Sequence, residues 1–267
     1  MRRDAKAPRG LVSAPPPGAF EHRRVVPTGR LEERVAHFWW VRWRVEAAHR
    51  VVTVPHPTVH LVFEPPGAAE VVGIPARRFE RRLSGSGFVF GVKFRPGGFS
   101  GLSPGGPRAL FGRRQPAVSV LGRPLGALTE AVAKAGSMEA CMDAAEAGLA
   151  WPRLSPEACE ARDLMEQLEG DRSCTRVDQL ATRAGVSVRA LQRLLLTHVG
   201  VGPKWALLRY RLHEAAERLK DPRIPLADLA ASLSYADQAH FTRDFTRVIG
   251  QSPAAFRALH RQSPESA

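Results

Sequence analysis

The chain has 267 residues, a formal net charge of +13 and 44% hydrophobic residues. That length accommodates about two domains, and because no run of about 18 apolar residues exists, no membrane span is expected. The three cysteines, Cys141, Cys159 and Cys174, lack the spacing of a disulfide framework or a structural zinc site, so we expect a cytoplasmic protein. The positive charge favours a polyanionic partner, but only five of the 39 basic residues are lysine, and this arginine-rich composition weakens the argument.

Residues 1–29 are predicted to form a disordered arm rich in basic residues and proline. They contain no apolar stretch of signal-peptide length, and the run PPPG at 15–18 does not support packing. We therefore expect the folded part of the chain to begin near residue 30.

Residues 30–100 are predicted to form a β-rich sensor or interaction domain. Runs rich in Val, Phe and Trp, separated by Gly/Pro clusters, indicate short strands in a mostly antiparallel sheet or barrel. These runs are HFWWVRWRVE (37–46), RVVTVPHPTVHLVF (50–63), AEVVGI (69–74) and GFVFGVKF (87–94). Residues 101–154 have helical periodicity instead, as in LGALTEAVAKA and MEACMDAAEAGLA, and are predicted to form a helical bridge.

The remainder, residues 155–262, is predicted to be an all-helical domain, which makes the fold class α+β. Its first helix begins at Ser155, whose side chain can cap the helix, followed by Pro156 at the first helical position. The domain contains an internal repeat at an offset of 49–50 residues, in which Gly200 matches Gly250 and Pro203 matches Pro253. Each copy reads as a short helix, a tight turn and a longer helix, which predicts helix-turn-helix units at 177–199 and 226–249.

The turn and the second helix of each unit carry specific signals. Gly185 suits the left-handed residue of the first turn, while Ser187 and Asp237 are N-cap residues for the two longer helices. Helical projection at about 100° per residue separates an apolar face from a polar face in both helices. The residues predicted to point inward are Val188, Leu191, Leu195 and Val199 in the first helix and Phe241, Phe245 and Ile249 in the second.

The polar faces carry the residues that we predict to contact DNA. These are Ser187, Arg189, Gln192, Arg193, Gln238, His240, Arg243 and Arg247. Arg and Gln present planar donors that match guanine and adenine edges, although Arg193 and Arg243 could equally bind phosphates, which receive half or more of such contacts. An uninterrupted helix at 203–220, about 27 Å long, would space the two units by a distance comparable to the roughly 34 Å between successive major-groove faces.

Residues from about 170 to 262 resemble the DNA-binding domain of AraC/XylS-family transcriptional regulators, most specifically in DQAHFTRDFTRVIGQSPAAFR. The resemblance implies a double helix-turn-helix fold with base- or backbone-contacting residues at the polar positions given above. Ser234 stands where the family usually has Gly, so we expect strain in the second turn. Leu196 and Thr246 stand where basic residues are common. In the N-terminal half, PHPTVHLVFEPPG and GFVFGVKFRPGGF resemble an uncharacterised domain found ahead of such readers.

The N-terminal half offers one candidate metal site. A spacing of four places His56 and His60 on one face of a strand, with Glu64 following on that face, and such a set can bind a divalent ion. Because Pro55 and Pro57 interrupt the strand, we favour no metal and no cofactor. Four tryptophans could line an apolar ligand pocket or belong to the core: Trp39, Trp40, Trp43 and Trp151.

Two functions are compatible with these patterns. The first is a non-enzymatic, one-component transcriptional regulator that binds double-stranded DNA and responds to an effector through its N-terminal domain. The second is a DNA-modifying or repair enzyme with the same reader, but residues 1–140 contain no cysteine for alkyl transfer and no catalytic constellation. We favour the regulator, with a small-molecule effector and RNA polymerase as candidate partners, as activator or repressor, and as monomer or homodimer.

Overall fold

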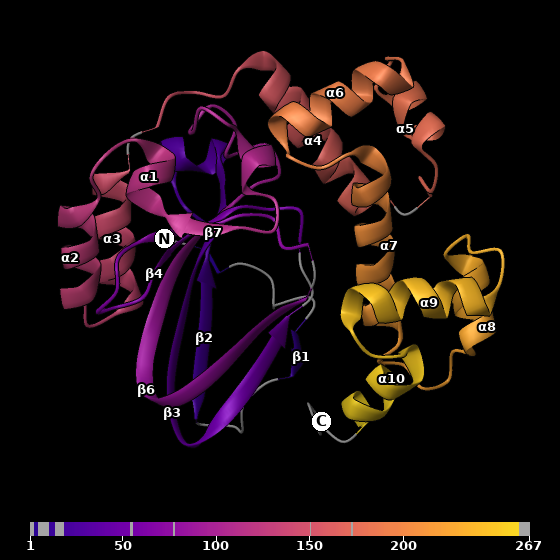
Figure 1. Ribbon diagram of the computed structural model, residues 1–267, viewed down its shortest axis with the longest axis horizontal. Coiled ribbons are helices and arrows are strands. Elements are labelled where there is room, and N and C mark those ends of the chain that lie inside the picture. The colour runs from indigo at the N-terminus through magenta and orange to yellow at the C-terminus, as the bar shows by residue number, and fades with distance from the viewer. Residues whose placement is uncertain are drawn as a thin grey trace.

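The computed structural model describes residues 3–4, 11–13, 19–53, 56–76, 78–149, 151–171 and 173–261. An antiparallel sheet forms the N-terminal half and helices form the C-terminal half (Figure 1). The predicted α+β fold is therefore confirmed. Among the described residues, no helix is long and apolar enough to cross a membrane.

All strands pair antiparallel in one sheet, in the order β1-β3-β6-β4-β5-β7, with β2 beside β3. Long strands β3 and β6 form its centre, and short 3-10 helices lie at Gly29–Glu33 and Pro107–Leu110. The strands are β1 (Leu11–Ser13), β2 (Phe20–Val25), β3 (Val35–Thr53), β4 (His60–Phe63), β5 (Glu70–Val72), β6 (Phe79–Phe94) and β7 (Arg114–Pro116).

The sheet departs from the prediction at three places. Strands β1 and β2 lie within the stretch 1–29 that we predicted to be a disordered arm, so that prediction is wrong for Leu11–Ser13 and Phe20–Val25; residues 1–2, 5–10 and 14–18 lie outside the described part. Strand β7 lies within the predicted helical bridge and pairs with β5. Strand β3 runs through the boundary expected between the first two strand-like runs.

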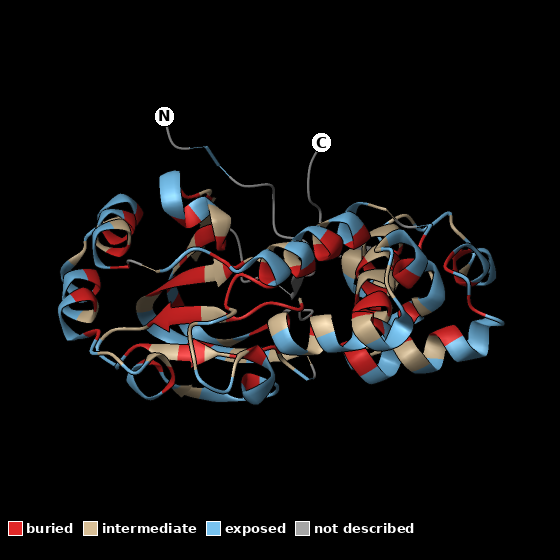
Figure 2. Ribbon diagram, turned by 90° about the horizontal axis from the view of Figure 1, so that it is seen from above, coloured by how far each residue is buried: buried red, intermediate tan, exposed pale blue. Residues whose placement is uncertain are grey.

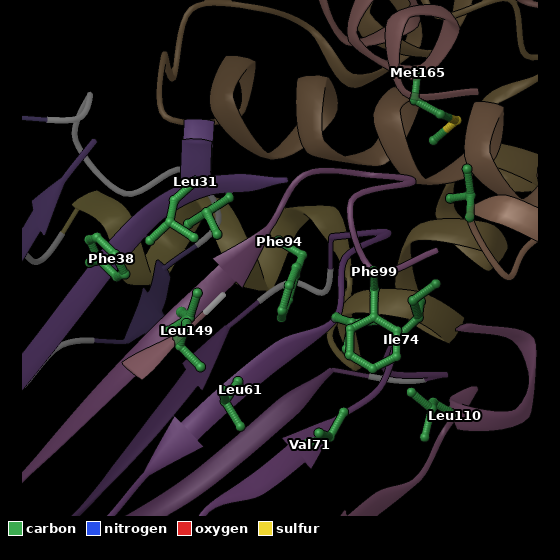
Figure 3. Packing of buried hydrophobic residues seen from close by; sticks show 14 of the residues in the cluster. Leu31, Phe38, Leu61, Val71, Ile74, Phe94, Phe99, Leu110, Leu149 and Met165 are labelled. Atoms are coloured by element: carbon green, nitrogen blue, oxygen red, sulfur yellow. The ribbon is translucent and has the colours of Figure 1, made fainter. Parts of the chain in front are cut away.

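Alternation along the strands gives the sheet two faces of different character. One face carries side chains such as Phe38, Leu61 and Phe94, which are fully buried with the bridge helices. Figure 3 shows strand residues of this face in one cluster with Leu149 and Met165 of the helical part. The bridge helices are α1 (Ala117–Leu121), α2 (Gly126–Lys134) and α3 (Met138–Gly148), and α4 (Pro156–Gly170) follows.

The C-terminal half contains two short-helix/long-helix pairs joined by α7. Ser155 caps α4 by accepting from the backbone N–H of Ala158, as predicted. At 16 residues, α7 is about 24 Å long, two residues shorter at its C-terminal end than the sequence indicates. The helices are α5 (Val177–Arg183), α6 (Val188–His198), α7 (Pro203–Arg218), α8 (Leu226–Ser232), α9 (Gln238–Ile249) and α10 (Pro253–Arg261).

The two pairs do not share one core. Leu180, Leu191 and Leu195 of α5 and α6 belong to the large cluster that also contains the sheet and bridge residues. Phe241 and Phe245 of α9 belong to a second cluster with the C-terminal half of α7. Figure 2 shows the resulting pattern on the helices, with buried stripes facing inward and exposed stripes facing outward. The α7 helix therefore connects two separately packed units.

Candidate nucleic-acid interface

The first helix-turn-helix unit has the turn that its sequence predicts. Gly185 adopts a positive φ of 65° between α5 and α6, a conformation that glycine reaches without a Cβ penalty. The Ser187 hydroxyl accepts a hydrogen bond of 3.2 Å from the backbone N–H of Ala190, which caps α6. Both predicted local roles are confirmed.

The second unit repeats this design with one substitution. Ser234 occupies the matching turn position with φ 59° and is the only non-glycine residue in the described part of the chain with positive φ. Asp237 caps α9 by accepting a 2.6 Å hydrogen bond from the backbone N–H of His240. The strain expected from serine in place of glycine therefore has a concrete backbone basis.

The longer helices bury one face each. Leu191 and Leu195 of α6, and Phe241, Phe245 and Ile249 of α9, are all fully buried. Edge-to-face ring contacts support the second unit, because Phe245 packs edge-on against Phe241 and also against Phe256 of α10. These contacts fix the rotation of each helix about its axis, and hence the direction of its polar face.

One inward prediction is wrong. Val188 at the first position of α6 is 40% exposed, although the helical projection assigned it to the buried face with Val199. It lies at the beginning of the helix, beyond the core that covers Leu191 and Leu195. The result is an exposed apolar side chain on the α6 terminus that carries Ser187 and Arg189, the position from which a helix reads base edges in a helix-turn-helix protein.

All eight residues predicted to contact DNA are exposed on the second helices or their caps. The side chains of five of them make no hydrogen bond or ion pair with any other described residue, and these are Arg189, Gln192, Arg193, Gln238 and Arg243. The arrangement leaves their donors available to an external acceptor. Their contacts with DNA remain predictions.

The other three predicted contacts are already engaged. The Ser187 hydroxyl serves as the N-cap of α6. Arg247 forms an ion pair of 2.7 Å with Asp244, and His240 Nε2 lies 3.6 Å from the same carboxylate. Sequence reasoning missed Asp244, although its spacing of three from Arg247 and four from His240 is that of helical ion pairs. A phosphate would have to compete with this carboxylate for Arg247.

Contacts with the N-terminal β domain hold the C-terminal ends of both longer helices. Ser100 Oγ lies 2.8 Å from Nδ1 of His198, the last residue of α6. Arg78 Nη1 donates to the carbonyl of Gly250, just after α9, at 2.9 Å. The Arg209 guanidinium in α7 donates to the carbonyl of Ala76 at 2.6 Å. The beginnings of α6 and α9 lie away from these anchors, whereas Arg247 lies in the last turn of α9, close to the Arg78 contact.

The three candidate metal ligands of the N-terminal half do not form a site. His56 precedes β4 and stacks on His213 of α7 at a ring distance of 3.9 Å. Nδ1 of His60 accepts from Trp39 Nε1 at 3.1 Å, and Glu64 pairs with Arg81. In the part of the chain that the structure describes, no three His, Cys, Asp or Glu residues are grouped to hold a metal ion.

A cavity of about 220 Å³ lies on the sheet face opposite the one that carries Phe38 and Leu61. Residues of β2 to β7 line it, including Phe79 at the beginning of β6, together with Pro75, which precedes that strand. Of the four tryptophans considered above, Trp39 and Trp43 line this cavity, whereas Trp40 and Trp151 belong to or pack against the large core cluster. Two of the four tryptophans therefore line a cavity and two contribute to the core, and ligand binding by the cavity stays a prediction.

Comparisons with known proteins divide the chain in the same way. A helix-turn-helix domain family matches residues 180–259, and a domain of unknown function, DUF6597, matches residues 23–114. The C-terminal part is 32% identical over 82 residues to the probable transcription factor PqrA of Proteus vulgaris, which covers 31% of this chain and 67% of that protein.

Two longer relatives match the same part. An AraC-like transcription regulator of Streptomyces antibioticus is 35% identical over 81 residues, which is 30% of this chain and 27% of that protein. The HTH-type transcriptional activator RhaS of Pectobacterium carotovorum is 33% identical over 78 residues, which is 29% of this chain and 28% of RhaS. The chain thus spans less than a third of the length of either relative.

Proposed function

The chain belongs to the AraC family of transcriptional regulators, and from this premise we propose that it binds double-stranded DNA sequence-specifically through residues 155–262. The observation that carries the proposal is the pair of recognition helices, α6 and α9, each buried on one face and each offering exposed, unpaired Arg and Gln side chains on the other. Such side chains are suited to guanine and adenine edges in the major groove.

The proposed contacts divide into two kinds. Arg189, Gln192 and Arg193 of α6 and Gln238 and Arg243 of α9 are free to read bases. Ser187, His240 and Arg247 already have partners within the protein, so we assign them to the phosphate backbone, where contacts position the helix without reading sequence.

Val188 is a further base-contact candidate in the first unit. Its exposed side chain lies at the beginning of α6, and an apolar group there can contact the methyl group of thymine. This assignment explains why an aliphatic residue is 40% exposed at a helix terminus otherwise occupied by polar side chains.

An alkyl-transfer role for the chain finds no support in its cysteines, since residues 1–140 contain none. Burial raises the pKa of the Cys141 thiol to about 11 and also raises the pKa of Cys174. An alkyl-accepting cysteine requires the opposite shift, because the thiolate is the nucleophile. The relatives are themselves transcription regulators, and we propose regulation without catalysis for this chain.

We propose that an effector acts through the short segment that precedes β6. Pro75 and Phe79 line the cavity of the β domain, while Ala76 and Arg78 of the same segment contact α7 and the end of α9. A ligand that shifts this segment would alter the position of the second unit relative to the first. RNA polymerase is the further partner proposed for transcriptional output.

The test is the pattern of protection on DNA. Duplex fragments retained by the full-length protein are sequenced, and a hydroxyl-radical footprint is then recorded on the selected site. We expect two protected segments on one side of the duplex, about 10 bp apart from centre to centre, because two recognition helices lie in one chain. Protection of a single major-groove segment would contradict the proposal that both helices read the same site.

A further inference from the structure

The cavity of the β domain has a flat aromatic wall. Trp39 and Trp43 of β3 lie over Gly91 and Gly87 of the neighbouring strand β6. A Cβ added at Gly91 would lie 2.1 Å from Cε2 of Trp39, and one at Gly87 would lie 2.6 Å from Cζ2 of Trp43. Each indole therefore occupies space that a side chain on β6 would otherwise fill, and its exposed surface contributes to the cavity.

One end of the same cavity is basic. His37, Lys93 and His60 are register partners on the adjacent strands β3, β6 and β4, so their side chains lie in a row on one face of the sheet. Arg24 and His22 of β2 extend this row, with Arg24 Nε 3.3 Å from His22 Nε2. All five residues line the cavity.

Within the described part of the chain, no carboxylate lines the cavity beside this basic row. Among the described residues that line the cavity there is no Asp or Glu. Two other arginines of the lining, Arg81 and Arg114, have acidic partners at the edge, since Arg81 pairs with Glu64 and Arg114 pairs with Glu70. The Lys93 ammonium, in contrast, makes no hydrogen bond or ion pair within the described part of the chain. The Glu169 carboxylate of α4, which lines a neighbouring cavity together with Lys93, partly opposes the lowering of the Lys93 pKa without forming an ion pair.

This arrangement is electrostatically unfavourable, because burial disfavours the charged forms of the residues in the row. Burial, followed by the nearby Arg24 charge, lowers the pKa of Lys93 to about 8, and burial lowers the pKa of Arg24 to about 10. His60 accepts the Trp39 N–H at Nδ1 and is held neutral, because burial lowers its pKa to about 3. Two cations thus lie beside neutral imidazoles, and an unpaired buried cation is unfavourable unless an anion reaches it.

We propose that the cavity binds a small organic carboxylate whose anionic group is held by Lys93 and Arg24 and whose apolar body lies on Trp39 and Trp43. This ligand class deepens the effector role proposed above and rests on it only for the regulatory consequence. A volume of about 220 Å³ lies below the 300 Å³ or so of pockets for drug-sized molecules, which fits a metabolite with one or two rings or a short chain. The carboxylate supplies the countercharge that the lining lacks, and charge-assisted hydrogen bonds are the strong ones in such a site.

The test compares two molecules of the same shape that differ in charge. Binding of 2-naphthoate and of 2-naphthamide to the full-length protein is measured by calorimetry and by thermal shift, without DNA. We expect 2-naphthoate to bind at least about tenfold more tightly than the amide, because only the acid forms charge-assisted bonds with Lys93 and Arg24. A ligand selective for the folded state also raises the melting temperature.

Variants assign the binding to the basic row. Lys93→Met should reduce the affinity for 2-naphthoate to that for the amide and leave the affinity for the amide unchanged. Arg24→Met should likewise weaken binding of 2-naphthoate. Replacing a buried ammonium by an apolar side chain of similar length is compatible with folding. Lys134→Met is the matched control, since Lys134 lies exposed on α2 in an ion pair with Glu130, and it should bind 2-naphthoate as the parent does.

Equal affinities for acid and amide, absence of binding by either, or parental binding in Lys93→Met would each overturn the ligand class. A separate titration with duplex DNA distinguishes this failure from failure of the regulator proposal. Lys93-dependent binding of 2-naphthoate without any change in DNA affinity supports the carboxylate site and contradicts its role as an effector site. Absence of DNA binding both with and without 2-naphthoate contradicts the regulator proposal alone.

Discussion

Replacing Ser234 by glycine should stabilise the second helix-turn-helix unit. Ser234 adopts φ 59° in the turn between α8 and α9, where an L-residue pays roughly 1–2 kcal/mol relative to the right-handed region. Glycine removes this conformational cost, but its greater conformational freedom in the unfolded chain lowers the free energy of unfolding by about 0.4–1 kcal/mol. The net expectation is a gain of about 0.5–1 kcal/mol in the free energy of unfolding. The Ser234 hydroxyl makes no hydrogen bond within the described residues, so no contact is lost.

The first turn provides the matched reverse substitution. Gly185 has φ 65°, and a Cβ built there meets no atom within 4 Å. Gly185→Ser therefore tests the backbone conformation without a steric clash and should destabilise by a similar amount. Urea unfolding followed by circular dichroism gives both midpoints, with the slope m as a check that the same transition is compared. A lower midpoint for Ser234→Gly, or an unchanged midpoint for both variants, would refute the strain argument.

Two further predictions concern the β domain and the reader. Because burial lowers the pKa of His22 to about 4 and that of His60 to about 3, the unfolded chain binds more protons than the folded chain below pH 6.5. Stability should therefore fall with decreasing pH from about 6.5 towards 4, by up to roughly 1.4 kcal/mol per pH unit for each histidine, and His60→Gln should flatten the profile measured by urea unfolding at each pH. A fragment of residues 155–262 should fold and bind the selected duplex as a monomer, because both units and α7 lie within it. Gel-shift and sedimentation-equilibrium measurements that show binding only as a dimer would argue against this.

The caps and turns of the DNA-binding domain could be predicted from the sequence because each depends on a few neighbouring residues. The caps Ser187 and Asp237 and the turn residues Gly185 and Ser234 each depend on backbone geometry within one turn of a helix. The apolar stripes of α6 and α9 follow from helical period alone. Val188 escaped this reasoning because period assigns a face but does not say where the covering core ends.

The β domain could be predicted less well because its features depend on pairing between distant strands. Strand β2 reads as polar, FEHRRV, yet His22 and Arg24 line the cavity while Val25 packs in the core. The basic row is formed by residues of four strands, and nothing in the local sequence indicates that His37, Lys93 and His60 are neighbours. The histidine spacing suggested a metal site, but Pro55 and Pro57 indicated that the strand is interrupted there, and the chain between His56 and His60 does lie outside β4.

The most direct test of sequence-specific recognition is the affinity of Arg193→Ala and Arg243→Ala for the selected duplex and for a random duplex across a series of salt concentrations. Arg44→Ala, an exposed arginine on β3, is the control for the loss of one positive charge. We predict that each recognition-helix variant loses about 1–3 kcal/mol of binding free energy on the selected duplex and much less on the random one. An equal loss on both duplexes, with a salt slope reduced by about one, would show phosphate contacts and contradict base reading by these two arginines.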